Sequence, residues 1–205
     1  MTRVKICGIT NLSDALCAAD LGAHALGFVF APSPRQISAD EAAAIIRRLP
    51  PFLATVALFV DEKPDHIRES MQITGCRYLQ LHGSEPPELV AELTGFPVIK
   101  AFRLRHSQDL EELARYPDAA AFLLDSYLEG VAGGTGQSFD WSLAVQARRF
   151  SKPIILAGGL NPENVAQAIR AARPDAVDVS SGVEAAPGKK DPEKMKRFLE
   201  AIRGL

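Results

Sequence analysis

The chain has 205 residues, of which 47% are hydrophobic and 23% charged, and its formal net charge is −2. This composition is that of an ordinary globular protein with a sizeable core, and it provides no electrostatic basis for binding nucleic acid or an acidic membrane. No apolar run approaches the roughly 18 residues that a membrane span needs. The N-terminus shows no signal peptide, so we expect a cytoplasmic protein.

The predicted elements alternate between apolar strands and amphipathic helices at a spacing of about 25 residues. In chain order, the predicted strands cover residues 4–7, 25–30, 55–60, 78–81, 98–102, 121–124, 154–157 and 176–179. The predicted helices that follow them cover residues 12–21, 39–49, 64–72, 86–93, 108–115, 141–149, 162–172 and 192–202. Several helices begin with capping sequences, namely Asn11 to Asp14, the box Ser38 to Glu41, Asn161-Pro162 and Asp191-Pro192.

Strict alternation of strand and helix predicts a parallel sheet with the helices outside it. Eight such units predict a closed (β/α)8 barrel, the TIM barrel, formed by one domain over residues 1–205. The alternative is an open doubly wound sheet. That fold usually has five or six strands, and the first strand here is not followed by its G-x-G-x-x-G fingerprint.

Polar side chains gather where the predicted strands end, which is the side of a barrel that carries the active site. The strand middles, in contrast, are almost entirely apolar. The polar and glycine positions at the carboxyl ends are Cys7, Gln80, His82, Arg103, Asp125, Gly158, Gly159, Asp178, Ser180, Ser181 and Gly182.

Alternation along the strands predicts which of these side chains point into the barrel. Lys5 and Cys7 share one face of the first strand, while Val4 and Ile6 share the face that suits the helices. A buried Lys5 needs a counter-charge. We expect Asp178, on the strand that closes beside the first, to provide it.

Two loops have the composition of a phosphate site. Gly158-Gly159 ends the seventh strand, and Ser180-Ser181-Gly182 follows the eighth. Glycine lets backbone N–H groups approach an anion closely, and serine adds further donors. The loops after strands seven and eight are where many barrels bind phosphate.

Three further features concern the mouth of the barrel. As a general base, Cys7 needs a lowered pKa, which Lys5 and the start of the first helix are expected to provide. Arg35 follows two prolines and is expected to point inward at a carboxylate or an aromatic ring. The glycine-rich stretch 126–140 is expected to be a mobile lid over the pocket.

The cysteines and histidines indicate neither disulfides nor a metal site. Cys7, Cys17 and Cys76 are odd in number and lack C-x-x-C spacing, which favours a reducing compartment. The four histidines show no spacing typical of metal ligands.

The chain resembles the phosphoribosylanthranilate isomerase family of tryptophan biosynthesis. The resemblance extends over nearly the whole sequence, in order. Its motifs are Lys5-Ile6-Cys7-Gly8-Ile9-Thr10, Gly27-Phe28-Val29-Phe30, Ser33-Pro34-Arg35, Leu79-Gln80-Leu81-His82-Gly83, Leu124-Asp125, Gly133-Gly134-Thr135-Gly136, Phe139-Asp140-Trp141, the run from Ala157 to Val165 and the run from Asp178 to Glu184.

The resemblance implies an Amadori rearrangement of N-(5-phosphoribosyl)anthranilate without a cofactor. It implies that Asp125 is the general acid, that Cys7 is the general base, and that Arg35 holds the anthranilate end. It also implies that Asp178 positions the substrate. From their place at the end of the fourth strand, Gln80 and His82 are expected to bind substrate as well. The phosphate is assigned to Gly158, Gly159, Ser180, Ser181 and Gly182.

Three other functions compete with this one. A histidine-pathway aminoaldose isomerase does the same chemistry, but that family has aspartate at the position of Cys7 and acts on a substrate with two phosphates. A metal-dependent epimerase is disfavoured by the scattered histidines. A catalytically silent sensor would tolerate loss of Cys7 or Asp125. The expected partner is a small phosphorylated substrate, with neither nucleic acid nor membrane, and the sequence leaves monomer and homodimer open.

Overall fold

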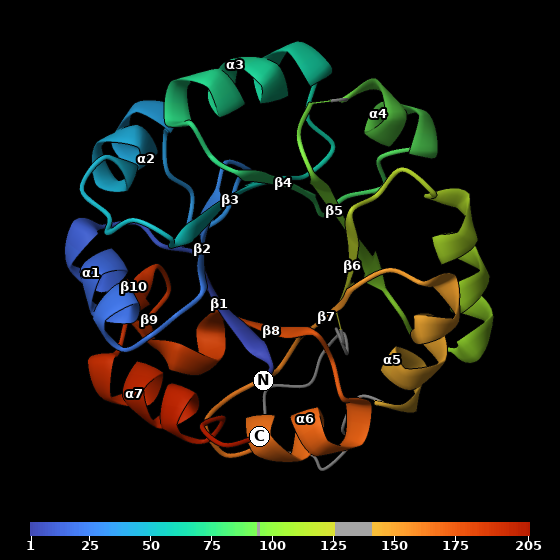
Figure 1. The fold of residues 1–205 in the computed structure, drawn as a ribbon. Coiled ribbons are helices and arrows are strands. Elements are labelled where there is room, and N and C mark those ends of the chain that lie inside the picture. Colours follow the sequence, from blue (N-terminus) through green and yellow to red (C-terminus); the bar gives the residue numbers. More distant parts are fainter. Residues whose placement is uncertain (94, 126–140) are drawn as a thin grey trace.

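The computed structural model describes residues 1–93, 95–125 and 141–205. Within these residues, eight parallel strands form a closed barrel in sequence order, and β8 pairs with β1 to close it. The helices surround the strands on the outside (Figure 1). The predicted (β/α)8 barrel is confirmed, and the open doubly wound alternative is wrong because β1 and β8 are hydrogen-bonded neighbours.

The strands lie close to their predicted positions. They are β1 (Arg3–Cys7), β2 (Ala25–Val29), β3 (Ala54–Phe59), β4 (Tyr78–Leu81), β5 (Val98–Arg103), β6 (Ala121–Asp125), β7 (Ile154–Ala157) and β8 (Ala176–Val179). The α-helices are α1 (Leu12–Asp20), α2 (Ala39–Ile46), α3 (Pro64–Thr74), α4 (Pro87–Glu92), α5 (Ser142–Ala147), α6 (Val165–Ala172) and α7 (Pro192–Glu200). Short 3₁₀ segments are η1 (Ser107–Arg115), η2 (Arg148–Phe150) and η3 (Ser181–Val183).

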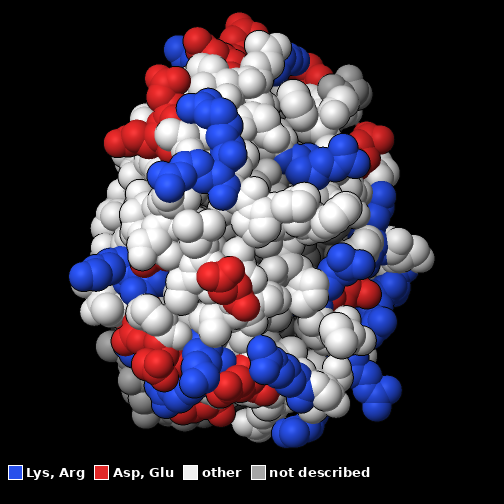
Figure 2. Space-filling model, turned by 60° about the vertical axis from the view of Figure 1, so that its left-hand side comes forward, with Lys and Arg blue, Asp and Glu red and all other residues white. Residues whose placement is uncertain are grey.

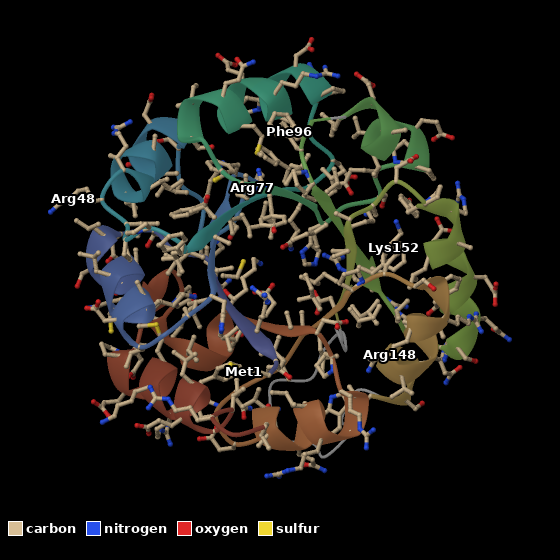
Figure 3. All side chains as sticks on the ribbon, in the orientation of Figure 1. Met1, Arg48, Arg77, Phe96, Arg148 and Lys152 are labelled. Carbon is tan, nitrogen blue, oxygen red and sulfur yellow. The ribbon has the colours of Figure 1, made fainter. Side chains whose placement is uncertain are left out.

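Alternation along the strands separates two apolar layers. Val4, Ile6, Val177 and Val179 belong to the large core between the barrel and the helices, as predicted from their parity. A smaller cluster inside the barrel includes Val56, Ile99, Ala101, Ala121, Leu123, Ile155 and Ala157. Side chains project from the strands both toward the helices and into the ring (Figure 3). The barrel is thus a packed core whose open end is available for chemistry.

Helix caps account for several of the helix starts. The side chain of Asn11 accepts from the N–H of Asp14, and Ser38 and Glu41 form the predicted capping box. Asp191 caps α7. The start predicted at Asn161-Pro162 is wrong by a few residues. The Asn161 side chain accepts from the N–H of Glu163 and that of Asn164 and forms a turn, so that α6 begins only at Val165.

Two local features differ from the prediction. Residues 107–115 wind as the 3₁₀ segment η1. The sequence does not distinguish a 3₁₀ helix from the predicted α-helix here. Leu110 and Leu113 are three residues apart, a spacing that places both on the buried face of either kind of helix. A small antiparallel hairpin, β9 (Glu184–Ala186) with β10 (Lys189–Lys190), follows β8 and was not predicted.

The surface in Figure 2 carries basic and acidic side chains interspersed with uncharged ones, in keeping with the small net charge. In the part of the chain that the structure describes, no helix is both long enough and apolar enough to span a membrane.

Candidate active site

Lys5 lies inside the barrel, where its residue is only 3% exposed. Its Nζ lies 2.9 Å from Oδ2 of Asp178 and donates to Oε1 of Gln80 at 2.9 Å. The predicted ion pair of Lys5 and Asp178 is confirmed. Burial lowers the pKa of Lys5, but the Asp178 carboxylate and the Cys7 sulfur outweigh burial, so that the pKa is raised and the ammonium persists.

A second set of contacts continues from Gln80 to the end of β6. The side-chain nitrogen of Gln80 lies 3.0 Å from Nδ1 of His82, and Nε2 of His82 lies 3.1 Å from Oδ2 of Asp125. Gln80 is fully buried, whereas the side chains of His82 and Asp125 are 17% and 19% exposed. The structure therefore brings the predicted residues Gln80, His82 and Asp125 together.

Cys7 ends β1 with its thiol in a small apolar cluster beside Lys5. Space for it depends on Gly27, because a Cβ at that position would lie 2.8 Å from Sγ of Cys7 and 3.0 Å from Cε of Lys5. Burial raises the pKa of the Cys7 thiol, and the opposing Lys5 charge does not compensate. The expectation of a lowered pKa is therefore wrong, because desolvation dominates.

Asp178 has one carboxylate oxygen to spare. Oδ2 binds Lys5, whereas Oδ1 is buried and has no hydrogen-bond partner among the residues that the structure describes. A buried acceptor without a donor is costly. A donor group on a bound molecule would satisfy it.

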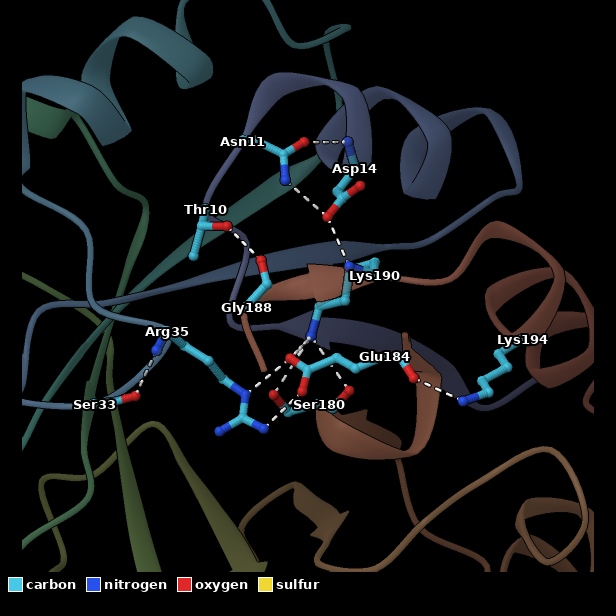
Figure 4. Close-up of polar contacts among 10 residues, drawn as sticks. All are labelled: Thr10, Asn11, Asp14, Ser33, Arg35, Ser180, Glu184, Gly188, Lys190 and Lys194. Carbon is cyan, nitrogen blue, oxygen red and sulfur yellow. Dashed lines mark hydrogen bonds and ion pairs between the residues drawn. The ribbon is translucent and has the colours of Figure 1, made fainter. Parts of the chain in front are cut away.

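Arg35 belongs to a charged cluster at the same end of the barrel (Figure 4). Its Nε donates to Oε1 of Glu184 at 2.8 Å and its Nη2 to Oε2 at 2.6 Å. Nζ of Lys190 donates to Oε1 of Glu184 at 2.8 Å and to the carbonyl of Ser180. These ionic contacts lower the pKa of Glu184 although burial opposes them, while burial lowers the pKa of Lys190.

The two predicted phosphate loops pack against each other. Gly158 and Gly159 have φ values of +83° and +61°, a conformation that favours glycine. A Cβ on Gly182 would overlap the carbonyl oxygen of Leu160, so the backbones after β7 and β8 touch there. Ser180 approaches the turn after β1, since a Cβ on Gly8 would lie 3.0 Å from its Oγ and 2.6 Å from Cδ of Arg35. Ser181 is exposed.

Sequence reasoning missed the partners of Arg35. Lys190 is one of these partners, and its side chain is completely buried against Glu184. The signal was Glu184, an acid at the end of the Ser180 motif, together with a basic pair five and six residues later. A second buried pair, Lys100 with Glu85 at 2.9 Å, lies outside the site and was also missed.

The predicted lid falls within residues 126–140, outside the described part of the chain. In the residues that are described, no cluster of three or more His, Cys, Asp or Glu side chains suits a metal ion.

The comparisons with known proteins decide the family. Residues 4–201 match the model of the N-(5'-phosphoribosyl)anthranilate isomerase family. The chain belongs to this family. It is 52% identical to the isomerase of Citrifermentans bemidjiense, with 100% of this chain and 98% of the relative covered. The isomerase of Pseudomonas putida is 50% identical over 98% of this chain and 97% of its own.

Solved structures agree with this assignment. The crystal structure of the Thermotoga maritima isomerase superposes with a TM-score of 0.93 at 47% identity, and both chains are covered completely. A second structure, of an isomerase in complex with reduced 1-(o-carboxyphenylamino)-1-deoxyribulose 5-phosphate, gives a TM-score of 0.90 at 45% identity, again over both complete chains. The chain is thus an isomerase of tryptophan biosynthesis that converts phosphoribosylanthranilate to the corresponding carboxyphenylamino-deoxyribulose phosphate.

Proposed function

We propose that the rearrangement proceeds by general acid–base catalysis with Asp125 as the acid and Cys7 as the base. Asp125 protonates the furanose ring oxygen, and the ring opens to an iminium. Cys7 removes the proton from the adjacent sugar carbon and gives an enolamine, which tautomerises to the ketone. The supporting observation is that these two residues, from β6 and β1, lie at opposite ends of the side-chain contacts through Lys5, Gln80 and His82.

The raised pKa of Cys7 makes the thiolate a minor form before substrate binds. Ring opening creates a cationic iminium next to the thiol. A nearby positive charge favours the thiolate, as the Lys5 ammonium also does. The base is therefore generated where and when the proton must be removed.

The loops after β7 and β8 are proposed to bind the phosphate through backbone N–H groups of Gly158, Gly159 and Gly182 and through Ser180 and Ser181. Support comes from the positive φ angles of the first two glycines and from the packing of Gly182 against the β7 loop. The buried ammonium of Lys190, 3.2 Å from the Ser180 carbonyl, adds positive potential beside this loop.

The remaining polar groups are proposed to orient the substrate. The free Oδ1 of Asp178 suits a sugar hydroxyl. Arg35 uses Nε and Nη2 on Glu184, and its Nη1 edge is proposed to bind the anthranilate carboxylate. Gln80 and His82 provide the polar side chains between Lys5 and Asp125.

Direct assay of the purified protein on phosphoribosylanthranilate, with the histidine-pathway substrate in parallel, tests the activity and its specificity. For the mechanism, Cys7→Ala and Asp125→Asn should each lose turnover by at least about 100-fold while product binding is retained. Turnover that survives both substitutions would rule out these catalytic roles.

We further propose a cytoplasmic homodimer. A solved structure of the Thermotoga maritima isomerase is of monomers generated from a dimeric protein, so this relative is a dimer, and the three cysteines here are free. Phe52 and Met1 are fully exposed, and a cavity of about 1390 Å³ lined in part by Met1, Tyr78 and Ile155 opens at the amino-terminal end of the strands. The main support for the proposal is the dimeric relative, which is 43% identical to this chain with both chains covered completely. Light scattering should give twice the chain mass, and Phe52→Asp should lower it. A wild-type mass equal to one chain would contradict the proposal.

A further inference from the structure

Four side chains inside the barrel mouth form a continuous series of hydrogen bonds. Nζ of Lys5 bonds Oε1 of Gln80, Nε2 of Gln80 bonds Nδ1 of His82, and Nε2 of His82 bonds Oδ2 of Asp125, all at 2.9–3.1 Å. Each group has a restricted set of donors and acceptors, so the direction of one bond constrains the next.

The direction is set at Lys5. An ammonium group has three donors and no acceptor, and the Asp178 carboxylate beside it keeps Lys5 charged by outweighing the effect of burial. The oxygen of the Gln80 amide must therefore face Lys5, because the opposite orientation would set an NH₂ group against the ammonium. Gln80 is fully buried, so solvent does not relieve such a conflict.

The amide orientation then sets the histidine tautomer. With its oxygen on Lys5, Gln80 presents its NH₂ group to Nδ1 of His82, and that NH₂ group only donates. Nδ1 must accept and carries no proton. The ring proton is consequently on Nε2, where it is donated to Oδ2 of Asp125. An imidazolium would place N–H against N–H at the Gln80 contact.

We propose that His82 is a positioning residue, fixed by Lys5 and Gln80 as the Nε2–H tautomer, which holds Asp125 through Oδ2 so that Oδ1 carries the proton delivered to the substrate. This proposal deepens the proposed role of Asp125 as general acid and rests on it. Since Oδ2 is occupied by the imidazole N–H, the carboxyl cannot rotate freely, and its acidic O–H is directed from a single oxygen.

The tautomer can be observed without any enzymatic activity. Protein labelled with ¹⁵N-histidine has four histidines, and loss of one set of signals in His82→Gln identifies those of His82. Long-range ¹H–¹⁵N spectra should show a protonated Nε2 and an unprotonated Nδ1. A proton on Nδ1, alone or with one on Nε2, overturns the proposal.

Gln80→Glu tests whether the Gln80 amide sets the tautomer of His82. A carboxylate beside Nδ1 accepts instead of donating, so the same spectra should show a proton on Nδ1. Gln80→Met, which removes both polar atoms at a similar size, should leave a mixture of tautomers. If His82 keeps an unprotonated Nδ1 in Gln80→Glu, Gln80 does not set the tautomer and the proposal fails.

Kinetics test the positioning of Asp125. His82→Leu removes the donor and should lower kcat by about 100-fold, with KM changed less than about threefold. His82→Gln can place an amide N–H near the Nε2 position and should recover at least about tenfold of that loss. Unchanged kcat in His82→Leu, or a loss confined to KM, overturns positioning. Failure of the acid role is distinguishable, because Asp125→Asn would then remain active while the tautomer spectra were as expected.

Discussion

Lys5 and Asp178 face each other across the seam that closes the barrel. They are direct Cα partners in the β1–β8 register, and their side chains meet at 2.9 Å in the interior. The pair thus has two roles. Each buried charge neutralises the other, and the Lys5 ammonium orients Gln80.

Removing one member of this pair should be far more damaging than removing both. Lys5→Met leaves a buried carboxylate without its counter-charge and should lower the free energy of unfolding by about 3 to 5 kcal/mol. Lys5→Met combined with Asp178→Leu should cost less than the sum of the two single changes. Urea denaturation measures each value. Arg197→Met, in an exposed pair with Glu163, is the control and should cost less than about 1 kcal/mol. Additive costs in the interior pair would contradict a direct interaction.

Two neighbouring lysines should respond differently to the same substitution. Lys190 is buried against Glu184, while Lys189 is exposed. Lys190→Met leaves the Glu184 carboxylate with Arg35 alone, and we expect a loss of about 3 kcal/mol in unfolding free energy. Lys189→Met should change it by less than about 0.5 kcal/mol. Thermal denaturation of the two variants side by side measures the contrast, and equal midpoints would exclude a structural role for the Lys190 ammonium.

The raised pKa of Cys7 predicts the pH at which its thiolate forms. Because burial raises that pKa in the free protein, the thiolate signal should appear only above about pH 9. The measurement is the difference in ultraviolet absorbance between the wild type and Cys7→Ala. Lys5→Gln removes a charge that favours the thiolate and should move the signal to higher pH. A Cys7 thiolate already fully formed at about pH 8 would contradict the raised pKa.

Gly182 should be intolerant of any side chain. A Cβ there would overlap the Leu160 carbonyl, and relief requires the β7 and β8 loops to separate. Gly182→Ala should therefore raise KM for phosphoribosylanthranilate by about tenfold or more. Gly22→Ala is the control, since it has a positive φ but no neighbour within 4 Å, and its effect should be confined to a stability loss of about 1 kcal/mol. An unchanged KM in Gly182→Ala would argue against a phosphate site between these loops.

The sequence predicts contacts best where the periodic alternation of side chains along a strand determines which residues point inward. The two-residue alternation placed Lys5 and Asp178 on inward faces, and strand order made them neighbours, so their ion pair could be derived before any coordinates. The contact between Arg35 and Glu184 could not be derived in this way, since it joins a loop to the start of β9, 149 residues away, with no periodic relation.

The sign of the Cys7 pKa shift also could not be predicted. It is decided by how far burial exceeds the effect of nearby charge, and both depend on distances in the folded protein. The space that Gly27 leaves for Sγ of Cys7 could not be predicted either, because it depends on the β1–β2 register that places Gly27 beside Cys7.

The β1–β8 seam has a consequence for biosynthesis. The two ends of the Lys5–Asp178 bond are 173 residues apart in the chain, so a growing polypeptide holds an uncompensated ammonium in its first strand until nearly all of the protein has left the ribosome. The orientation of Gln80 and His82 depends on that ammonium. The buried ion pair, and the orientation of Gln80 that depends on it, can therefore form only after the eighth strand has been synthesised.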